Sequence, residues 1–373
     1  MELERFLVTE RFFSDIRWLG SRTGHGFQSE PYRPNFRNRL PIIDARAHCH
    51  LNLVHYSIFT SYLSQPKMSS GWNTIVSDAG VFTELVSRLG VENVQIEELY
   101  SIDSASLKAL APIHAVVFLF KYGTVDRDST AQDLPLDGAY DANYQESGIF
   151  FARQTIQNAC ATQAVLNSLL NKTDEINIGS ELSNILSFAS GFDPDMCGDV
   201  LSNSDVIREV HNSFSAPKFI DQDDLPRPDV DEKDNGLFHF ITYVNINNTI
   251  YELDGLKRFP IKHDTLLTPE EFYEKLPDVL QRRISKYAGE IRFSLLAITN
   301  DKLQQYQAIG DELSIQQELE KRERWNRDNK WRRHDYTRLT VQLLKDICGP
   351  MSDEEWSKVL LKARAKTMSR TRV

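Results

Sequence analysis

Three residues that lie far apart in this 373-residue chain have the types that thiol-dependent hydrolysis requires: a cysteine, a histidine and a carboxylate. Cys160 falls at the start of a predicted helix that runs from about Ala159 to Asn171. Unpaired amide groups and the helix dipole at that end stabilise a thiolate, the form of cysteine that attacks a carbonyl carbon. Cys160 is therefore a candidate nucleophile, although a cysteine at a helix start is more often a small buried residue.

A side-chain amide precedes this cysteine by six residues. Gln154 lies on the approach to the helix, in the run Gln-Thr-Ile-Gln-Asn-Ala-Cys. An amide placed there can donate a hydrogen bond to the oxyanion of a tetrahedral intermediate, together with the backbone N–H of Cys160. Gln154 is therefore a candidate oxyanion donor.

His239 and Asp254 are predicted to meet across a β-hairpin. Two strands are expected around Asn247-Asn248, which is a two-residue turn signal. With that turn, the numbers of paired residues sum to 495, so Asp254 is a diagonal neighbour of His239 on the same face, with backbones about 7–8 Å apart. A carboxylate in that place holds the imidazole tautomer that accepts a thiol proton. A lone histidine between two phenylalanines is more often a core residue, but the aspartate on its face favours catalysis.

The elements that must position these residues alternate between helix and strand from residue 71 to about residue 300. Strands and helices mixed in this way predict a two- or three-layer α+β domain. The expected helices are 78–90, 159–171, 180–190, 199–213 and one that starts at Thr268, and the expected strands are 114–120, 238–244, 250–253 and 290–298.

A long acidic segment leads into His239. Residues 215–236 have no secondary-structure period and contain seven acidic residues against three basic ones. Loops of this length inside a domain are usually functional lids or disordered segments. We expect this one to arch over the active site, and a plain surface insertion is the alternative.

Charge and composition narrow the function classes. The formal net charge is -10, yet residues 319–373 contain 15 Lys and Arg against 8 Asp and Glu. An acidic body with a basic tail indicates two units with different partners. No apolar run reaches the roughly 20 residues that a membrane span needs, so no membrane partner is expected. Four scattered cysteines fit a reducing compartment, cytosol or nucleus, better than a disulfide scaffold.

The last helices are predicted to dock on another surface. Two short helices with apolar stripes follow a charged helical stretch, and they cannot bury those stripes alone. The expected domains are an N-terminal extension of unknown role at 1–70, a catalytic domain at 71–300, a helical connector at 301–335 and a C-terminal helical docking domain at 336–373.

These motifs resemble the ubiquitin C-terminal hydrolases, a family of cysteine deubiquitinases. The resemblance lies in QTIQNACATQ around Cys160, FHF around His239 and YELDGL around Asp254, and it covers about residues 71–373. Ala161 stands where many members have glycine. This departure and the basic tail are similar to the longer, proteasome-associated branch of the family. The run RWNRDNKWRRHDY and the final two helices resemble the C-terminal docking domain of that branch.

The resemblance implies a papain-like, three-layer α-β-α catalytic domain with a central antiparallel sheet and a knotted backbone, followed by a helical C-terminal extension. It implies that Cys160 is the nucleophile, His239 the general base and then acid, Asp254 the carboxylate that orients His239, and Gln154 the oxyanion donor. The substrate would be a peptide or isopeptide bond at the C-terminal glycine of ubiquitin. No metal or organic cofactor is needed for such a mechanism.

The resemblance also implies partners. The first is ubiquitin, with its conjugates. The second, bound through the C-terminal helices, is a ubiquitin-receptor subunit of the proteasome's regulatory particle. There the enzyme would act in ubiquitin-dependent degradation. A related docking on a nuclear chromatin-remodelling complex is inhibitory in the family. These partners place the protein in the cytoplasm and the nucleus. The loop over the site would limit the size of the leaving group.

Other interpretations remain open from the sequence. One is a non-catalytic ubiquitin-binding scaffold, and another is a general thiol protease or acyltransferase with the same triad. A nucleic-acid role for the tail is disfavoured, because its basic residues are mixed with acids and no known binding module is present. A metal site at His48-Cys49-His50, with His55 nearby, is disfavoured because no second Cys/His pair completes tetrahedral spacing.

Overall fold

The computed structural model describes residues 71–215, 238–287 and 292–370. The expected N-terminal extension, the His48-Cys49-His50 motif and almost all of the acidic loop lie outside these residues. Within the described ranges, no helix combines the length and the apolar composition needed to cross a membrane.

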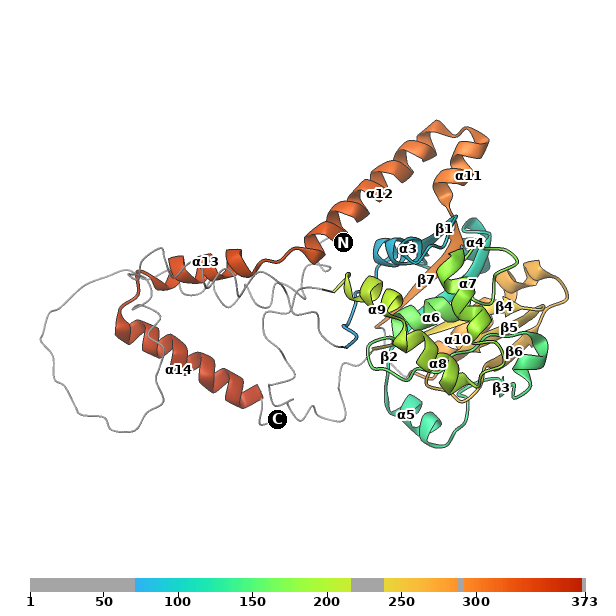
Figure 1. Ribbon diagram of the computed structural model, residues 1–373, viewed down its shortest axis with the longest axis horizontal. Coiled ribbons are helices and arrows are strands. Elements are labelled where there is room, and N and C mark those ends of the chain that lie inside the picture. Colours follow the sequence, from blue (N-terminus) through green and yellow to red (C-terminus); the bar gives the residue numbers. More distant parts are fainter. Residues whose placement is uncertain (1–70, 216–237, 288–291, 371–373) are drawn as a thin grey trace, which may run out of the picture. The chain divides into compact units, whose positions relative to one another are not determined.

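A seven-stranded sheet forms the centre of the catalytic domain, on the right-hand side of Figure 1. The strand order is β1-β7-β2-β4-β5-β6-β3, and every neighbouring pair is antiparallel. The central antiparallel sheet expected from the resemblance is therefore confirmed. The strands are β1 (Val94–Glu98), β2 (Ile113–Lys121), β3 (Ala139–Tyr140), β4 (Phe238–Ile246), β5 (Thr249–Leu253), β6 (Ile261–Thr265) and β7 (Phe293–Asn300).

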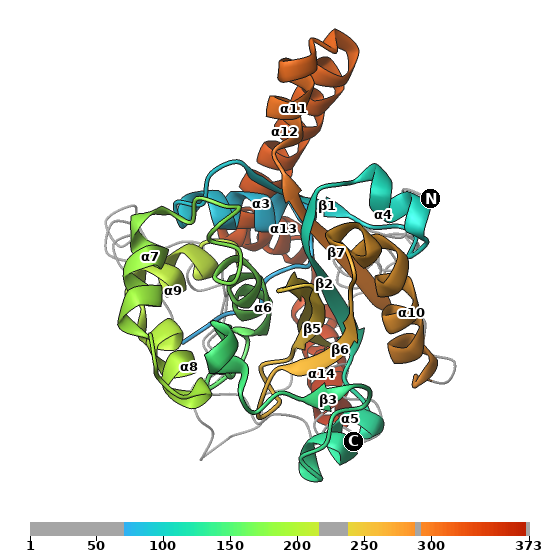
Figure 2. The same ribbon diagram turned by 90° about the vertical axis from the view of Figure 1, so that its right-hand side faces the viewer.

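Helices cover both faces of this sheet, and Figure 2 shows α6, α7 and α8 on one side and α10 on the other. The helices of the catalytic domain are α3 (Ala79–Arg88), α4 (Ser104–Ala109), α5 (Thr124–Ala131), α6 (Cys160–Leu169), α7 (Gly179–Phe188), α8 (Pro194–Asn203), α9 (Asp205–Asn212) and α10 (Phe272–Ser285), with short 3₁₀ turns η3 (Tyr144–Ser147) and η5 (Pro269–Glu271).

The central strand β2 shows why two helical layers are needed. Successive side chains of a strand point to opposite faces, so Ala115 and Val117 enter the core beneath α6, whereas Val116 and Phe118 enter the core beneath α10. All four side chains are buried. A strand buried on both faces has a nearly continuous apolar sequence. Because helices cover both faces of the sheet, the fold has three layers.

Several expected elements differ in detail. The helix expected at 199–213 is two helices, because Ser204 ends α8 and caps α9 by accepting a hydrogen bond from the Ile207 N–H. The helix predicted to start at Thr268 begins instead with η5 and continues as α10. Strands β1 and β6 and helices α4 and α5 were not expected, because their short runs mix polar and apolar residues.

The connector is a pair of helices, α11 (Lys302–Ile309) and α12 (Glu312–Arg333), which meet at Gly310. Gly310 has φ of 71°, a left-handed conformation that ends α11. The far end of α12 lies against α3. There Arg332 pairs with Asp78 at 2.8 Å, and the Asn329 amide donates to the Gly80 carbonyl at 3.1 Å. The connector is thus anchored on the catalytic domain.

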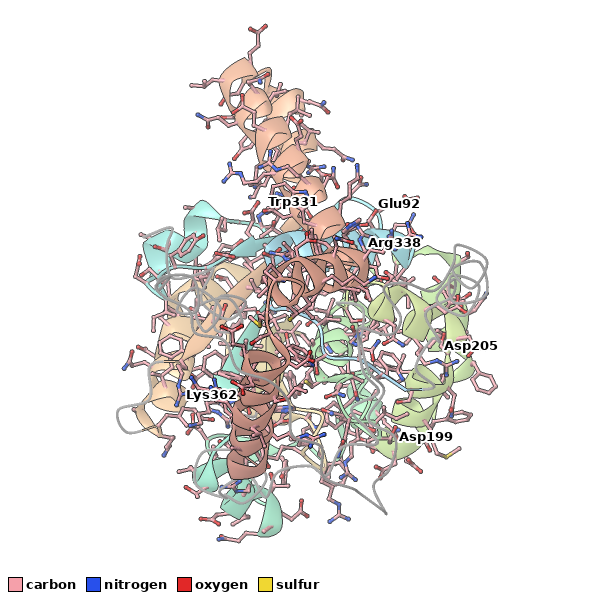
Figure 3. The ribbon with its side chains drawn as sticks, turned by 90° about the vertical axis from the view of Figure 1, so that its left-hand side faces the viewer. Glu92, Asp199, Asp205, Trp331, Arg338 and Lys362 are labelled. Carbon is pink, nitrogen blue, oxygen red and sulfur yellow. The ribbon has the colours of Figure 1, made fainter. Side chains whose placement is uncertain are left out.

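Two further helices follow, α13 (Thr337–Cys348) and α14 (Asp353–Arg370). A capping box opens α14, because the Ser352 N–H donates to the Glu355 carboxylate and the Glu355 N–H donates to the Ser352 hydroxyl. Figure 3 labels three exposed carboxylates, Glu92, Asp199 and Asp205, and two basic residues of the last two helices, Arg338 and Lys362, together with Trp331 of α12. The five charged residues illustrate the uneven charge of the chain.

Candidate active site

Cys160 is the first residue of α6, as predicted. The helix is entered through Asn158, whose φ of 68° turns the chain sharply, and its side-chain amide donates to the Trp72 carbonyl at 3.0 Å. Ala159 at the N-cap offers no side-chain acceptor. The amide groups of the first turn therefore point at the cysteine end of the helix without a side-chain cap.

His239 and Asp254 meet as the hairpin register predicted. Thr242 pairs with Leu253, so that their numbers sum to 495, and both asparagines of the turn have positive φ. His239 Nε2 lies 2.7 Å from Asp254 Oδ1, and both side chains are buried. The sequence pattern thus located this contact between side chains 15 residues apart.

The carboxylate of Asp254 is held by its backbone surroundings. Strand β5 ends at Leu253, and the chain then turns so that the Leu256 N–H donates to Asp254 Oδ1 at 2.9 Å. Burial would raise the pKa of this carboxyl, but the positive charge and hydrogen bond of His239, with the charge of Arg283, lower it below its ordinary value. Asp254 is therefore a fixed, ionised partner.

His239 is poised as an imidazolium. Burial would lower the pKa of its ring, but the charge and hydrogen bond of Asp254, together with a hydrogen bond to Cys160, outweigh burial and raise the pKa from 6.5 to about 9. Since Nε2 is engaged by Asp254, Nδ1 is the nitrogen left for the thiol. The three residues are thus joined in the order Cys160, His239, Asp254.

Gln154 lies between the entry to α6 and the turn after Asp254. Its backbone N–H donates to the Gly255 carbonyl at 2.8 Å, and its side-chain Nε2 donates to the Ile156 carbonyl at 3.0 Å. Its Oε1 atom is buried and accepts no hydrogen bond within the described structure. One amide hydrogen is therefore committed to the main chain, and the second remains for another acceptor.

A buried charge cluster beneath the histidine was missed by the sequence reasoning. Arg283 on α10 is fully buried and pairs with Asp126 and Glu252, each at 3.3 Å. Its guanidinium lies 5.0 Å from the centre of the Phe120 ring, and that ring meets His239 edge-on, with ring centres 5.8 Å apart. One signal existed: Arg283 follows Leu276, Val279 and Leu280 on the buried stripe of α10.

Lys257 ties the turn after Asp254 to helix α5. Its ammonium group donates to the hydroxyls of Ser129 at 2.6 Å and Thr130 at 3.0 Å, and to the Leu134 carbonyl at 3.3 Å. Burial lowers the pKa of this lysine below its ordinary value. The buried residues beneath the site are therefore held in place by contacts among β5, α5 and α10.

Cys197 lies outside this site, and the metal motif at His48-Cys49-His50 falls outside the described residues. Cys197 is buried, and its thiol lies 3.7 Å from the carbonyls of Ala189 and Phe192, which marks it as structural. Among the residues that the structure describes, no group of three His, Cys, Asp or Glu side chains is arranged to hold a metal ion.

Comparison with family models gives two matches along the chain. Residues 72–285 match the model described as ubiquitin carboxyl-terminal hydrolase, family 1. Residues 311–347 match a second model, described as ubiquitin carboxyl-terminal hydrolases. The two matches fall on the catalytic domain and on the connector with the first C-terminal helix.

Similar proteins carry the same description. The chain is 44% identical over 310 residues to ubiquitin carboxyl-terminal hydrolase 2 of Schizosaccharomyces pombe, which covers 81% of this chain and 99% of that protein. It is 37% identical over 298 residues to ubiquitin carboxyl-terminal hydrolase ubh-4 of Caenorhabditis elegans, which covers 74% of this chain and 87% of that protein.

Solved structures give the same fold. The UCH37 catalytic domain of Trichinella spiralis, bound to ubiquitin vinyl methyl ester, matches with a TM-score of 0.50 and 33% identity, over 62% of this chain and 97% of that chain. A second structure of Trichinella spiralis UCH37 bound to ubiquitin vinyl methyl ester matches with a TM-score of 0.51 and 28% identity, over 70% of this chain and 99% of that chain.

Proposed function

We infer, because the chain belongs to the ubiquitin carboxyl-terminal hydrolase family 1, that it is a cysteine deubiquitinase that cleaves the bond after the C-terminal glycine of ubiquitin. The single observation that carries this function is the buried contact of 2.7 Å between His239 and Asp254, with Cys160 as the hydrogen-bond partner of the same imidazole. The substrate bond is a peptide or an isopeptide bond.

Acylation uses three of the candidate residues. The proton of the Cys160 thiol rests on His239 as the imidazolium, and the sulfur attacks the carbonyl carbon of the terminal glycine as a thiolate. The oxyanion receives hydrogen bonds from the Gln154 amide and the backbone N–H of Cys160. His239 then gives its proton to the amine as the C–N bond breaks, which leaves ubiquitin joined to Cys160 as a thioester.

Deacylation reverses the proton path. His239 accepts a proton from a water molecule, which attacks the thioester carbonyl, and the C–S bond breaks to release ubiquitin with a free carboxylate. Asp254 keeps Nε2 of His239 engaged through both halves, so that the nitrogen facing the sulfur and the water is always the same one. This chemistry needs no metal or organic cofactor.

The test is hydrolysis of ubiquitin that carries a fluorogenic amide at its C-terminus, compared between the wild-type protein and Cys160→Ala. We expect turnover by the wild type and none by the variant. Turnover that persists in the variant, once a contaminating hydrolase is excluded, would show that another residue is the nucleophile.

A thiol-reactive ubiquitin probe separates this function from the alternatives. A non-catalytic scaffold would bind ubiquitin without becoming labelled, whereas the proposed enzyme becomes labelled on Cys160. A general thiol protease would also cleave unrelated peptides at comparable rates. We expect no such cleavage, because an unrelated peptide lacks the folded body of ubiquitin, whose binding energy brings the scissile bond to Cys160.

The C-terminal helices are proposed to dock the enzyme on a ubiquitin-receptor subunit of the proteasome's regulatory particle, and on a chromatin-remodelling complex in the nucleus. Two observations support a docking role: the second family match covers residues 311–347, and the apolar side chains Leu339, Leu343 and Leu344 of α13 are exposed. The enzyme would then work in the cytoplasm and the nucleus, which imaging of the tagged full chain tests.

A further inference from the structure

The segment that carries Gln154 is held in a narrow slot. It begins at Ala152, whose carbonyl accepts hydrogen bonds from Gln163 at 2.7 Å and Asn167 at 3.1 Å, and whose N–H donates to Asn167 at 2.9 Å. Both of those side chains belong to α6, the helix that Cys160 begins. One end of the segment is therefore fixed to the helix of the nucleophile.

Helix α8 closes one side of the slot. The Arg153 N–H donates to the Pro194 carbonyl at 2.8 Å, and the hydroxyls of Thr155 and Ser202 lie 3.0 Å apart. Between those two contacts stands Gly198, where an added Cβ would lie 2.0 Å from the Arg153 carbonyl oxygen. No side chain other than hydrogen fits there unless the main chain moves.

The turn after Asp254 closes the opposite side. The Gln154 N–H donates to the Gly255 carbonyl at 2.8 Å. A Cβ added to Gly255 would lie 3.1 Å from Gln154 Cβ and 3.2 Å from the Gln154 nitrogen. Neither Gly198 nor Gly255 has a positive φ, so the reason for glycine at both positions is close approach of backbone rather than backbone conformation.

We propose that Gly198 and Gly255 are positioning residues of the oxyanion hole, which set the place of the Gln154 amide relative to Cys160. This inference rests on the proposed function, in which Gln154 is the oxyanion donor. An oxyanion donor is effective only when it already stands where the charge develops. A slot closed by two glycines keeps the amide in place from both sides, while α6 fixes its distance from the nucleophile.

Gly255→Ala is the decisive variant, because its new methyl group displaces the segment by only a few tenths of an ångström. We expect kcat for ubiquitin with a fluorogenic C-terminal amide to fall about tenfold, with KM unchanged. The affinity for ubiquitin aldehyde, whose tetrahedral adduct places its oxygen in the oxyanion hole, should fall by a similar factor. The rate at which iodoacetamide alkylates Cys160, and its pH profile, should stay unchanged, because that reaction needs no oxyanion donor.

A double-mutant cycle with Gln154→Ala tests whether the glycine acts through the amide. In that background Gly255→Ala should lower kcat by less than about twofold, because the amide group that it displaces is already gone. An equal tenfold loss in both backgrounds would overturn the proposal, and so would an unchanged affinity for the aldehyde or a parallel loss of alkylation rate.

Two other variants complete the design. Gly123→Ala is the matched control, because its Cβ would meet nothing closer than 4.0 Å, and it should keep wild-type kcat. Ser202→Ala removes the hydrogen bond to Thr155 without adding volume, so it should give a smaller loss of kcat that also disappears in the Gln154→Ala background. It serves in place of Gly255→Ala if that variant does not fold. A wild-type enzyme without turnover would contradict the proposed function instead, independently of these glycines.

Discussion

At the scale of single residues, the defining feature of the site is the buried, positively charged imidazolium of His239. His239 holds its proton because the buried carboxylate of Asp254 and the sulfur of Cys160 both face its ring, although burial alone would favour the neutral form. The hairpin explains how this arises: the two-asparagine turn sets the register, and the register puts Asp254 on the face of His239. The contact could be predicted because each step in it is local in sequence.

The raised pKa of His239 predicts the alkaline limit of the enzyme. Activity that depends on the imidazolium should fall as the pH rises through about 9. In Asp254→Asn the main attraction is lost while burial remains, so the pKa falls and the alkaline limb of kcat/KM should move down by about one pH unit or more. A limb that stays in place in this variant would contradict the assignment of Asp254.

The raised pKa of His239 also makes the free energy of unfolding depend on pH. The folded chain binds this proton more tightly than the unfolded chain, whose histidine titrates near 6.5. The stabilisation is therefore complete below about pH 6.5 and is lost as the pH rises through about 9. Urea unfolding of the wild type at pH 6 and pH 9.5, compared with His239→Gln, should show a pH-dependent difference of this sign, and a constant difference would contradict it.

At the scale of elements, contacts between distant segments complete the site. Arg283 joins α10 to β5 and α5 in one buried cluster, and α12 returns to cover α3. Neither contact was predicted, because each joins residues more than 30 apart in the sequence whose pairing no local periodicity reveals. The split of the expected helix at 199–213 was missed for a different reason, since a single capping serine interrupts an otherwise continuous pattern.

Two neighbouring arginines on α10 provide a matched test of burial. Arg283→Met leaves the carboxylates of Asp126 and Glu252 buried without their cation, so we expect the free energy of unfolding to fall by about 3–5 kcal/mol. Arg282→Met breaks only the partly exposed pairs with Asp137 and Asp264, and should cost about 0–1 kcal/mol. Urea unfolding measures both, and similar losses in the two variants would contradict the buried cluster.

The anchoring of α12 can be broken at a glycine. A Cβ at Gly80 would lie 2.5 Å from Trp325 Cγ and 2.8 Å from its Cβ, so Gly80→Ala should push α12 away from α3. We expect faster hydrogen exchange at residues 325–333 in this variant, because separation exposes their surroundings. Gly71→Ala is the control, since a Cβ there meets nothing within 4 Å. Unchanged exchange in Gly80→Ala would mean that α12 does not depend on this contact.

At the scale of the whole molecule, the chain combines an acidic enzyme with a basic helical tail. The two family matches fall on these two regions, and the change of sign in charge along the sequence already indicated that they serve different partners. Sequence reasoning could therefore predict a role for each region, whereas the anchoring of the connector on the catalytic domain needed the structure.

This division predicts that docking and hydrolysis can be separated. Leu339→Asp with Leu343→Asp places charges on exposed apolar positions of α13, so we expect loss of co-purification with proteasome regulatory particles. Hydrolysis of ubiquitin with a fluorogenic C-terminal amide should remain at the wild-type rate. Gln342→Asp, on the same helix between these two leucines, is the control and should keep docking. Retained docking in the double variant would remove α13 from the interface.

The central claim is that Cys160 attacks the C-terminal carbonyl of ubiquitin with the help of His239. The most direct measurement is to treat the full chain with ubiquitin vinyl methyl ester and to locate the adduct by mass spectrometry of tryptic peptides. We predict a single adduct on Cys160, its absence in Cys160→Ala and its slow formation in His239→Gln. An adduct on Cys49, Cys197 or Cys348, or rapid labelling of Cys160 without His239, would contradict the account.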